Sequence, residues 1–175
     1  MAAVVGAAYP DLFDAIGIHS GLPYGAATSQ AAAFAALARG VPDPRVLGRL
    51  AFGAMGRNAR ILPAIVVHGT ADPVVAPING DQLVEQWLVT NHLAAPSDFD
   101  GTPALPHEIL RAHAPGGHGS VTSRWKDRRD RTILEYVKVE GLAHAWSGGA
   151  RAAFSDPRGP AASELLLAFF TNAIR

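Results

Sequence analysis

The stretch Ala64–His68, which reads AIVVH, restricts the fold of this chain more than any other segment. It is a continuous apolar run, rich in β-branched residues, which follows Pro63 and ends in Gly-Thr-Ala-Asp-Pro. A strand without alternating polar and apolar residues is typical of a parallel sheet that is covered on both faces. The run therefore predicts a buried strand of such a sheet, with polar residues following its carboxyl end.

The segments around this strand alternate between predicted helices and predicted strands. Such alternation is typical of an α/β fold with a mostly parallel sheet and flanking helices, here with an added β-hairpin. The sequence shows no internal repeat and no linker, so one domain is predicted over residues 1–175. Strands are expected at Phe13–His19, Ala64–His68, Ser120–Trp125 and Thr132–Val139. Helices are expected at Ala2–Tyr9, Ser29–Arg39 and Asn79–Asn91 and after Gly159-Pro160. A long loop is expected at Pro96–Gly119.

Composition excludes several classes of protein. Hydrophobic residues make up 49% of the chain and charged residues 17%, which is too apolar for a disordered protein. The charges of the 15 basic and 15 acidic residues cancel. The sequence has no basic stripe with interleaved aromatic residues, so no nucleic-acid partner is predicted. No apolar run is long enough to span a membrane, and Met1–Gly6 lacks the basic region of a signal peptide. The absence of cysteine excludes disulfides and thiolate chemistry but leaves the cellular compartment open.

Two polar residues at predicted strand ends favour acid–base chemistry. Asp72 follows the strand Ala64–His68 in HGTADPVV, and His144 follows the strand Thr132–Val139 in GLAHAWSGG. Ligands of parallel sheets collect at the carboxyl ends of the strands. An acid that precedes a histidine matches the order Ser, Asp, His of α/β-hydrolases, in which the carboxylate orients the imidazole. Taken singly, Asp72 could be an Asp-Pro turn residue and His144 a loop histidine bonded to backbone, but together they favour an acid–base pair.

The serine that such a pair would serve is not evident. It should precede the acid, within G-x-S-x-G between a strand and a helix. Ser20 has isoleucine two positions before it and no helix directly after it, and Ser147 follows His144 instead of preceding the acid. Ser147 is therefore predicted to be a loop residue, and Ser120 and Ser123 to be hairpin residues.

The histidine-rich stretch before the hairpin does not predict a metal site. His107, His113 and His118 fit neither a helix-borne pair of ligands nor a compact zinc site with thiolates, and solvated loop histidines are expected instead. The glycines of Gly116–Gly119 lack the lysine and the following helix of a phosphate-binding loop. No cofactor and no metal are predicted.

Four stretches together resemble the C-terminal part of the poly(3-hydroxybutyrate) depolymerase-type esterases: YPDLFDAIGIHSGLPYGAA, PAIVVHGTADPVV, GLAHAWSGG and SDPRGPAASELLLAFF. These esterases are α/β-hydrolases related to feruloyl and acetylxylan esterases. The resemblance implies that Asp72 is the triad acid and His144 the base. Trp146 would line the ester pocket or pack under the loop, and His19 and Tyr24, close to the expected cleft, are assigned packing roles.

The same resemblance implies a partial domain. Met1–Asp11 is similar to the segment that follows the nucleophile elbow, so the catalytic serine is expected before Met1. The expected function is a serine-type ester hydrolase acting on a polyester or a small acyl ester, with negligible activity in this chain alone. The alternative is a truncated α/β domain without activity, or half of a site that another chain completes. Esterases of this kind are often exported. No membrane partner is expected. Self-association is expected through an exposed edge at the strand Phe13–His19.

Overall fold

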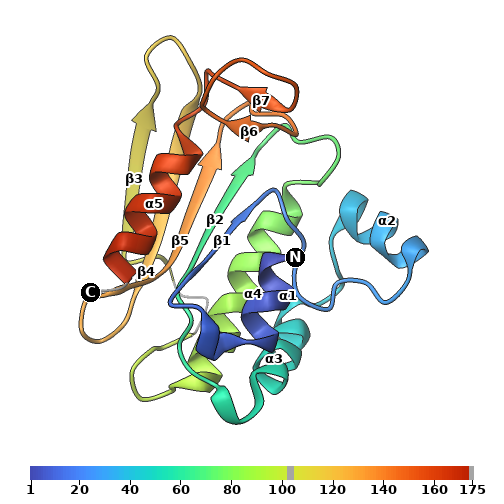
Figure 1. The fold of residues 1–175 in the computed structure, drawn as a ribbon, viewed down its shortest axis with the longest axis vertical. Helices are drawn as coiled ribbons and strands as arrows, with labels where there is room; N and C mark the ends of the chain where they lie inside the picture. Colours follow the sequence, from blue (N-terminus) through green and yellow to red (C-terminus); the bar gives the residue numbers. More distant parts are fainter. Residues whose placement is uncertain (102–104, 174–175) are drawn as a thin grey trace.

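A computed structural model describes residues 1–101 and 105–173 of the chain, and its centre is a five-stranded mixed sheet (Figure 1). Strands β1, β2 and β5 are parallel, whereas β4 is antiparallel to β5 and β3 is antiparallel to β4. The order across the sheet is β1 (Ile16–His19), β2 (Ala64–Gly69), β5 (Thr132–Val139), β4 (Gly119–Lys126) and β3 (Glu108–His113).

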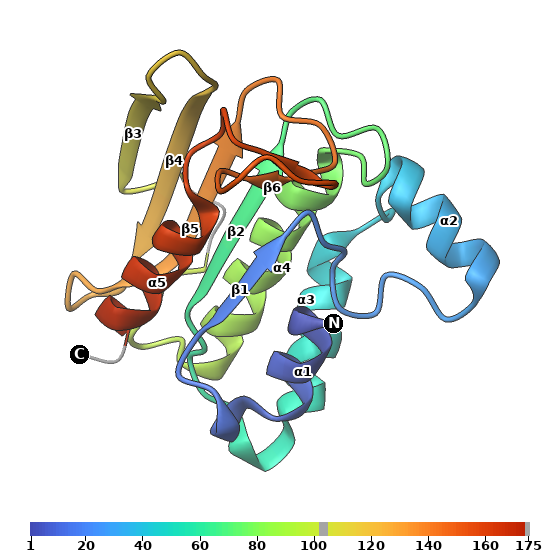
Figure 2. The same cartoon turned by 45° about the horizontal axis from the view of Figure 1, so that its top comes forward.

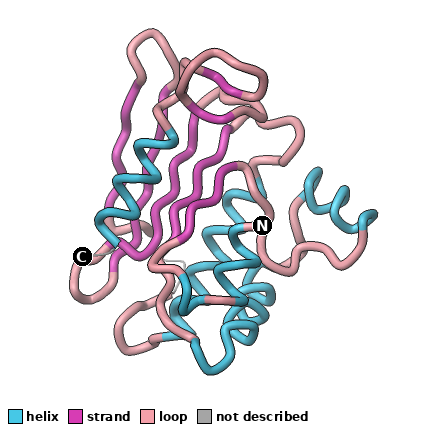
Figure 3. The backbone as a smooth tube through the Cα atoms, viewed as in Figure 1, coloured by secondary structure: helices cyan, strands magenta, loops and turns pink. Residues whose placement is uncertain are grey.

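Helices cover both faces of the sheet, as Figures 2 and 3 show. One face packs against α1 (Ala2–Ala8), α3 (Pro44–Met55) and α4 (Ile78–Ala94), and the other against α5 (Ala162–Ala173). The helix α2 (Gln30–Arg39) projects to the side of the molecule (Figure 2). The remaining elements are short: η1 (Pro10–Leu12), η2 (Gly56–Asn58), and the parallel pair β6 (Trp146–Ser147) and β7 (Ser155–Asp156).

The strand β2 confirms the interpretation of the AIVVH run. Every residue of β2 is buried, and its side chains alternate between two apolar clusters. Ala64 and Val66 join the cluster beneath α3 and α4, whereas Ile65 and Val67 join the cluster beneath α5. A strand covered by helices on both faces has no solvent side, so its sequence shows no alternation of polarity.

The predicted helices are present with small shifts at their ends. The side chain of Ser29 caps α2 by accepting the amide of Ala32 at 3.2 Å, and Gly40 ends that helix with a φ of 71°. The helix α4 is longer than the predicted Asn79–Asn91 and buries the whole of Trp87. The hairpin of β4 and β5 also matches the prediction.

Two elements escaped the sequence analysis. The helix α3 contains two glycines that weaken its helical pattern, although Asp43 caps it and Pro44 occupies its first turn. The prediction that Pro96–Gly119 is a loop is wrong for Glu108–His113, which forms β3, while residues 102–104 lie outside the described residues. Most side chains of β3 are exposed, and the strand is defined by its pairing with β4 and not by an apolar face.

The strand β1 lies at one edge of the sheet in the described chain. Beside it, an apolar groove of about 370 Å³ runs between β1 and α1 and is lined by Met1, Val5 and Phe13 among others. Among the described residues, no helix combines the length and the apolar character needed to cross a membrane.

Candidate active site

The structure brings Asp72 and His144 together at the carboxyl ends of β2 and β5. The Nδ1 atom of His144 donates a hydrogen bond to Oδ2 of Asp72 at 2.9 Å. The two residues are 72 positions apart in the chain. They meet because β2 and β5 are parallel neighbours, which places the loops after both strands at one edge of the sheet.

Backbone contacts hold these two loops against each other. Thr70 donates its amide to the carbonyl of Val139 at 2.9 Å, and Ala71 donates its amide to the carbonyl of Leu142 at 3.1 Å. In return, the amide of Gly141 donates to the Thr70 hydroxyl at 2.9 Å. Gly69 permits this approach, because a Cβ atom there would collide with the carbonyl oxygen of Leu142. The separation of Asp72 and His144 is thus set by backbone and not by side-chain rotamers alone.

The carboxylate of Asp72 is oriented from two sides. Its Oδ1 atom accepts the amides of Val74 at 2.9 Å and Val75 at 2.8 Å, which leaves Oδ2 for His144. Burial alone would raise the pKa of Asp72, but the hydrogen bonds from His144, Val75 and Val74 outweigh it and lower that pKa below its ordinary value. Asp72 therefore stays ionised at neutral pH and can stabilise a positive charge on the imidazole.

The imidazole of His144 has one nitrogen engaged and one available. Its side chain is 37% exposed, whereas that of Asp72 is fully buried. No other described residue forms a hydrogen bond with its Nε2 atom. A histidine that is fixed at Nδ1 and open at Nε2 can take a proton from a nucleophile and pass it to a leaving group.

His68 lies next to Asp72 as a neutral, buried side chain. Burial lowers the pKa of His68, and its Nε2–H donates to the carbonyl of Val75 at 2.9 Å. The same nitrogen lies 3.7 Å from Oδ2 of Asp72, which is too long for a hydrogen bond. His68 therefore holds the turn that presents the amides of Val74 and Val75 to Asp72.

Trp146, two residues after His144, packs against His19. Their rings stack with centroids 4.8 Å apart, and 40% of Trp146 remains exposed. The exposed part of Trp146, two residues after His144, is consistent with either the predicted pocket wall or a packing role. Tyr24 instead exchanges two backbone hydrogen bonds with the Gln86 side chain, a packing arrangement.

The serines of the chain do not complete a triad with this pair. Ser147 is fully buried, and its hydroxyl donates to the carbonyl of Pro160 at 2.7 Å. The hydroxyl of Ser20 lies 3.1 Å from Nδ1 of His19 and not beside His144. Among the described residues, no serine hydroxyl is hydrogen-bonded to His144.

Two of the other histidines differ from the prediction of solvated loop residues. His118 is not a solvated loop residue, because its Nε2 atom lies 3.0 Å from Oδ2 of Asp156 in a partly buried pair. His113 is the last residue of β3, and His107 accepts the amide of Lys126 at 3.2 Å. The described part of the chain contains no group of three or more histidine and carboxylate side chains placed to hold a metal ion.

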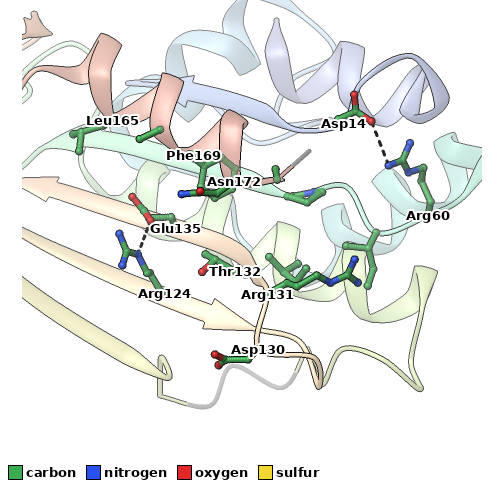
Figure 4. Close-up of a pocket in the computed structure, with 15 residues that line it drawn as sticks. Asp14, Arg60, Arg124, Asp130, Arg131, Thr132, Glu135, Leu165, Phe169 and Asn172 are labelled. Atoms are coloured by element: carbon green, nitrogen blue, oxygen red, sulfur yellow. Dashed lines mark hydrogen bonds and ion pairs between the residues drawn. The ribbon is translucent and has the colours of Figure 1, made fainter. Parts of the chain in front are cut away.

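A pocket of about 520 Å³ lies at the opposite end of the sheet (Figure 4). It is lined by residues at the amino ends of β2 and β5 and by the last turns of α5. Four of its charged side chains form two pairs with each other: Arg124 with Glu135 at 2.6 Å, and Arg60 with Asp14 at 3.9 Å. Because it contains no histidine and lies away from His144, we assign the chemistry to the carboxyl end of the sheet.

Comparison with known proteins identifies relatives of this chain. A family model described as esterase PHB depolymerase matches residues 1–101. Poly(3-hydroxyalkanoate) depolymerase C of Paucimonas lemoignei is 34% identical over 149 residues. That alignment covers 82% of this chain and 32% of the relative, so the chain spans about a third of the relative's length.

Proposed function

Because the chain belongs to the PHB depolymerase family of esterases, we propose that it provides the acid and base of a Ser-Asp-His active site. The observation that carries the proposal is the hydrogen bond from His144 to a buried, ionised Asp72. In this role Asp72 holds the imidazole with Nδ1 protonated, and Nε2 is the atom that moves protons.

The proposed reaction is ester hydrolysis in two steps. A serine hydroxyl attacks the ester carbonyl while Nε2 of His144 takes its proton, and the alcohol then leaves with that proton as the acyl-serine forms. Water then attacks the acyl group, gives a proton to Nε2, and releases the acid as the proton returns to the serine. Asp72 stabilises the imidazolium in both steps and remains ionised.

We assign the serine to a segment of the intact protein that precedes Met1. Two features support this assignment: the resemblance of Met1–Asp11 to the segment after a nucleophile elbow, and the hydrogen bonds that hold Ser20 and Ser147 away from His144. The domain described here would then be one part of a larger hydrolase domain. The oxyanion amides would also come from outside the chain.

The substrate class that fits best is an acyl ester, including a polyester. The relative's name identifies it as a poly(3-hydroxyalkanoate) depolymerase. The half-exposed ring of Trp146 beside His144 offers an apolar surface for the acyl part. A polyester of hydroxyalkanoic acids presents such apolar acyl units next to each scissile bond.

The test uses two forms of the protein and an ester of p-nitrophenol. The first form is the 175-residue chain, and the second is extended upstream of Met1 in its own reading frame. We expect negligible turnover from the first form, since loss of the nucleophile removes about a million-fold in a serine hydrolase. The extended form should turn over the ester and lose that activity on His144→Ala, with exposed His113→Ala as the matched control.

A fluorophosphonate probe that reacts with activated serines provides the second measurement. It should label the extended form upstream of Met1 and leave the 175-residue chain unlabelled. Labelling of Ser147 or Ser20, or turnover by the short chain that disappears on Ser147→Ala, would show that the serine has been misassigned. An extended form without an elbow or activity would favour the non-catalytic alternative.

A further inference from the structure

The side chain of His19 connects the end of β1 to the loop that carries His144. Its ring stacks on Trp146, and its Nε2 atom accepts the amide of Ser147 at 3.2 Å. Its Nδ1 atom lies 3.1 Å from the Ser20 hydroxyl. Trp146 and Ser147 follow His144 by two and three residues, so His19 contacts the segment that leads directly away from the base.

These hydrogen bonds define the tautomer of His19. Since a backbone amide can only donate, Nε2 must be the unprotonated acceptor, and the proton of the neutral ring resides on Nδ1. The Nδ1–H then donates to the Ser20 hydroxyl. Protonation of Nε2 would set two N–H groups against each other and break the bond to Ser147, a residue that is fully buried.

The partner of Nδ1 is itself held by the sheet. Ser20 has a φ of 50°, an uncommon conformation for a residue with a side chain. Its amide donates to the carbonyl of Val67 in β2 at 2.9 Å, which anchors the serine to the sheet. A continuous series of contacts therefore runs from β2 through Ser20 and His19 to Ser147.

We propose that His19 is a positioning residue: as a neutral ring, it holds the Trp146–Ser147 segment so that His144 stays aligned with Asp72. The catalytic meaning of this alignment rests on the proposed function, whereas the positioning itself does not. Unlike a packing role, it requires both an acceptor at Nε2 and a flat ring against Trp146.

The surroundings keep His19 uncharged near neutral pH. Burial lowers the pKa of His19 to about 4, and the neighbouring His68 acts in the same direction. His144 also disfavours the charged ring, and only Asp72 favours it. The ring therefore retains its acceptor nitrogen over the pH range in which a histidine base is active.

Two substitutions separate the two contacts of His19. His19→Phe keeps a flat ring against Trp146 but removes the acceptor, whereas His19→Gln keeps an amide oxygen near the position of Nε2 and removes the ring. His113→Phe, an exposed position in β3, is the matched control. Far-UV circular dichroism and a thermal transition establish that each variant is folded before it is compared.

The first readout is hydrogen exchange of the Ser147 amide, followed at low protein concentration. We expect exchange to accelerate by about tenfold or more in His19→Phe, because the amide loses its acceptor, with a smaller change in His19→Gln. The ring ¹⁵N signals of His144 should shift in His19→Phe and stay in place in His113→Phe. This measurement needs no serine and no substrate, so it is independent of the proposed esterase activity.

The second readout is kinetic and uses the extended form. If His19 positions the base, kcat should fall by about tenfold to a hundredfold in His19→Phe with KM little changed, and partly recover in His19→Gln. Unchanged Ser147 exchange and unchanged His144 signals in a folded His19→Phe variant would overturn the inference. Altered exchange in an extended form without any activity would leave the positioning role standing and contradict only the proposed function.

Discussion

At the scale of single residues, the negative charge of Asp72 is the feature on which the proposed site depends most. Asp72→Asn preserves the size of the side chain but removes the charge that stabilises the imidazolium and can reverse the tautomer of His144. In the extended enzyme we expect kcat to fall by about 10⁴-fold, the order seen for such a change in a serine protease triad. Steady-state kinetics with a p-nitrophenyl ester measures this.

The control for this substitution is Asp14→Asn. Asp14 is an exposed carboxylate at the opposite end of the sheet, paired with Arg60 at 3.9 Å. It should leave kcat unchanged, since an exposed pair of this length contributes little. Equal activity of Asp72→Asn and the parent enzyme would remove Asp72 from the mechanism.

His19 links stability to pH at the same scale. The pKa of His19 is about 4 in the folded protein, against about 6.5 for an unfolded histidine, so only the unfolded chain binds a proton between these values. The contribution of His19 to the free energy of unfolding should therefore be fully present above about pH 6.5. It should fall towards pH 4, by at most about 3 kcal/mol. Urea unfolding at about pH 7 and about pH 4.5 measures the change.

His19→Phe should make that decline shallower without abolishing it. The pKa of buried His68 is also lowered, so His68 also makes the free energy of unfolding fall as the pH falls. The lowered pKa of Asp72 places the effect of Asp72 at more acidic pH. His113→Phe should retain the parent's dependence. A His19→Phe variant that loses as much stability as the parent between the two pH values would contradict the assignment.

At the scale of elements, the loops after β2 and β5 touch at Gly69. A Cβ atom in Gly69→Ala would collide with the Leu142 carbonyl oxygen, which is backbone and cannot rotate away. We expect a loss of about 1–3 kcal/mol in unfolding free energy, because one loop must shift. Activity of the extended form should fall as well, because the shift separates Asp72 from His144. Urea denaturation and ester turnover test the two effects.

Gly53→Ala is the matched control within the same chain. Gly53 lies inside α3, and a Cβ atom there would meet no other atom within 4 Å. The same added methyl group should therefore stabilise the protein by about 0.5–1 kcal/mol through helix propensity. If both alanines had the same effect on stability, the close approach at Gly69 would not be important for the fold.

At the scale of the whole molecule, the β1 edge is a candidate surface for self-association. The apolar groove between β1 and α1 lies beside exposed side chains that include Val4 and Phe13. An unpaired strand edge next to apolar surface favours pairing with another copy of the chain. We expect the 175-residue chain to associate as its concentration rises, and Phe13→Asp to weaken this association. Sedimentation velocity measures both.

Phe154→Asp tests whether the effect is specific to that edge. Phe154 is 82% exposed and lies between β6 and β7 in the chain, and it is not among the residues that line the groove beside β1. It should leave the association of the chain unchanged. A parent chain that sediments as a monomer at every concentration and melts in one sharp transition would show that the edge does not drive association.

Local sequence determined most of the elements. The unbroken apolar run of Ala64–His68 predicted a strand covered on both faces, and β2 is such a strand. The placement of Asp72 and His144 after two strands predicted that they lie at one end of the sheet. There, Nδ1 of His144 lies 2.9 Å from Oδ2 of Asp72. These features depend on residue type and spacing, which a sequence displays directly.

Only the tertiary structure decided what neighbouring strands and loops do to one another. The strand β3 forms through backbone pairing with β4, so its mostly exposed side chains gave no apolar pattern to detect. His19 is an apparent packing residue in sequence. Its contacts with Trp146 and Ser147 exist because the sheet places the end of β1 beside a distant loop, in which Ser147 lies 128 positions after His19 in the chain. Hydrogen bonds and ring stacking act between atoms in space, and spacing along the chain does not encode which distant residue will supply the partner.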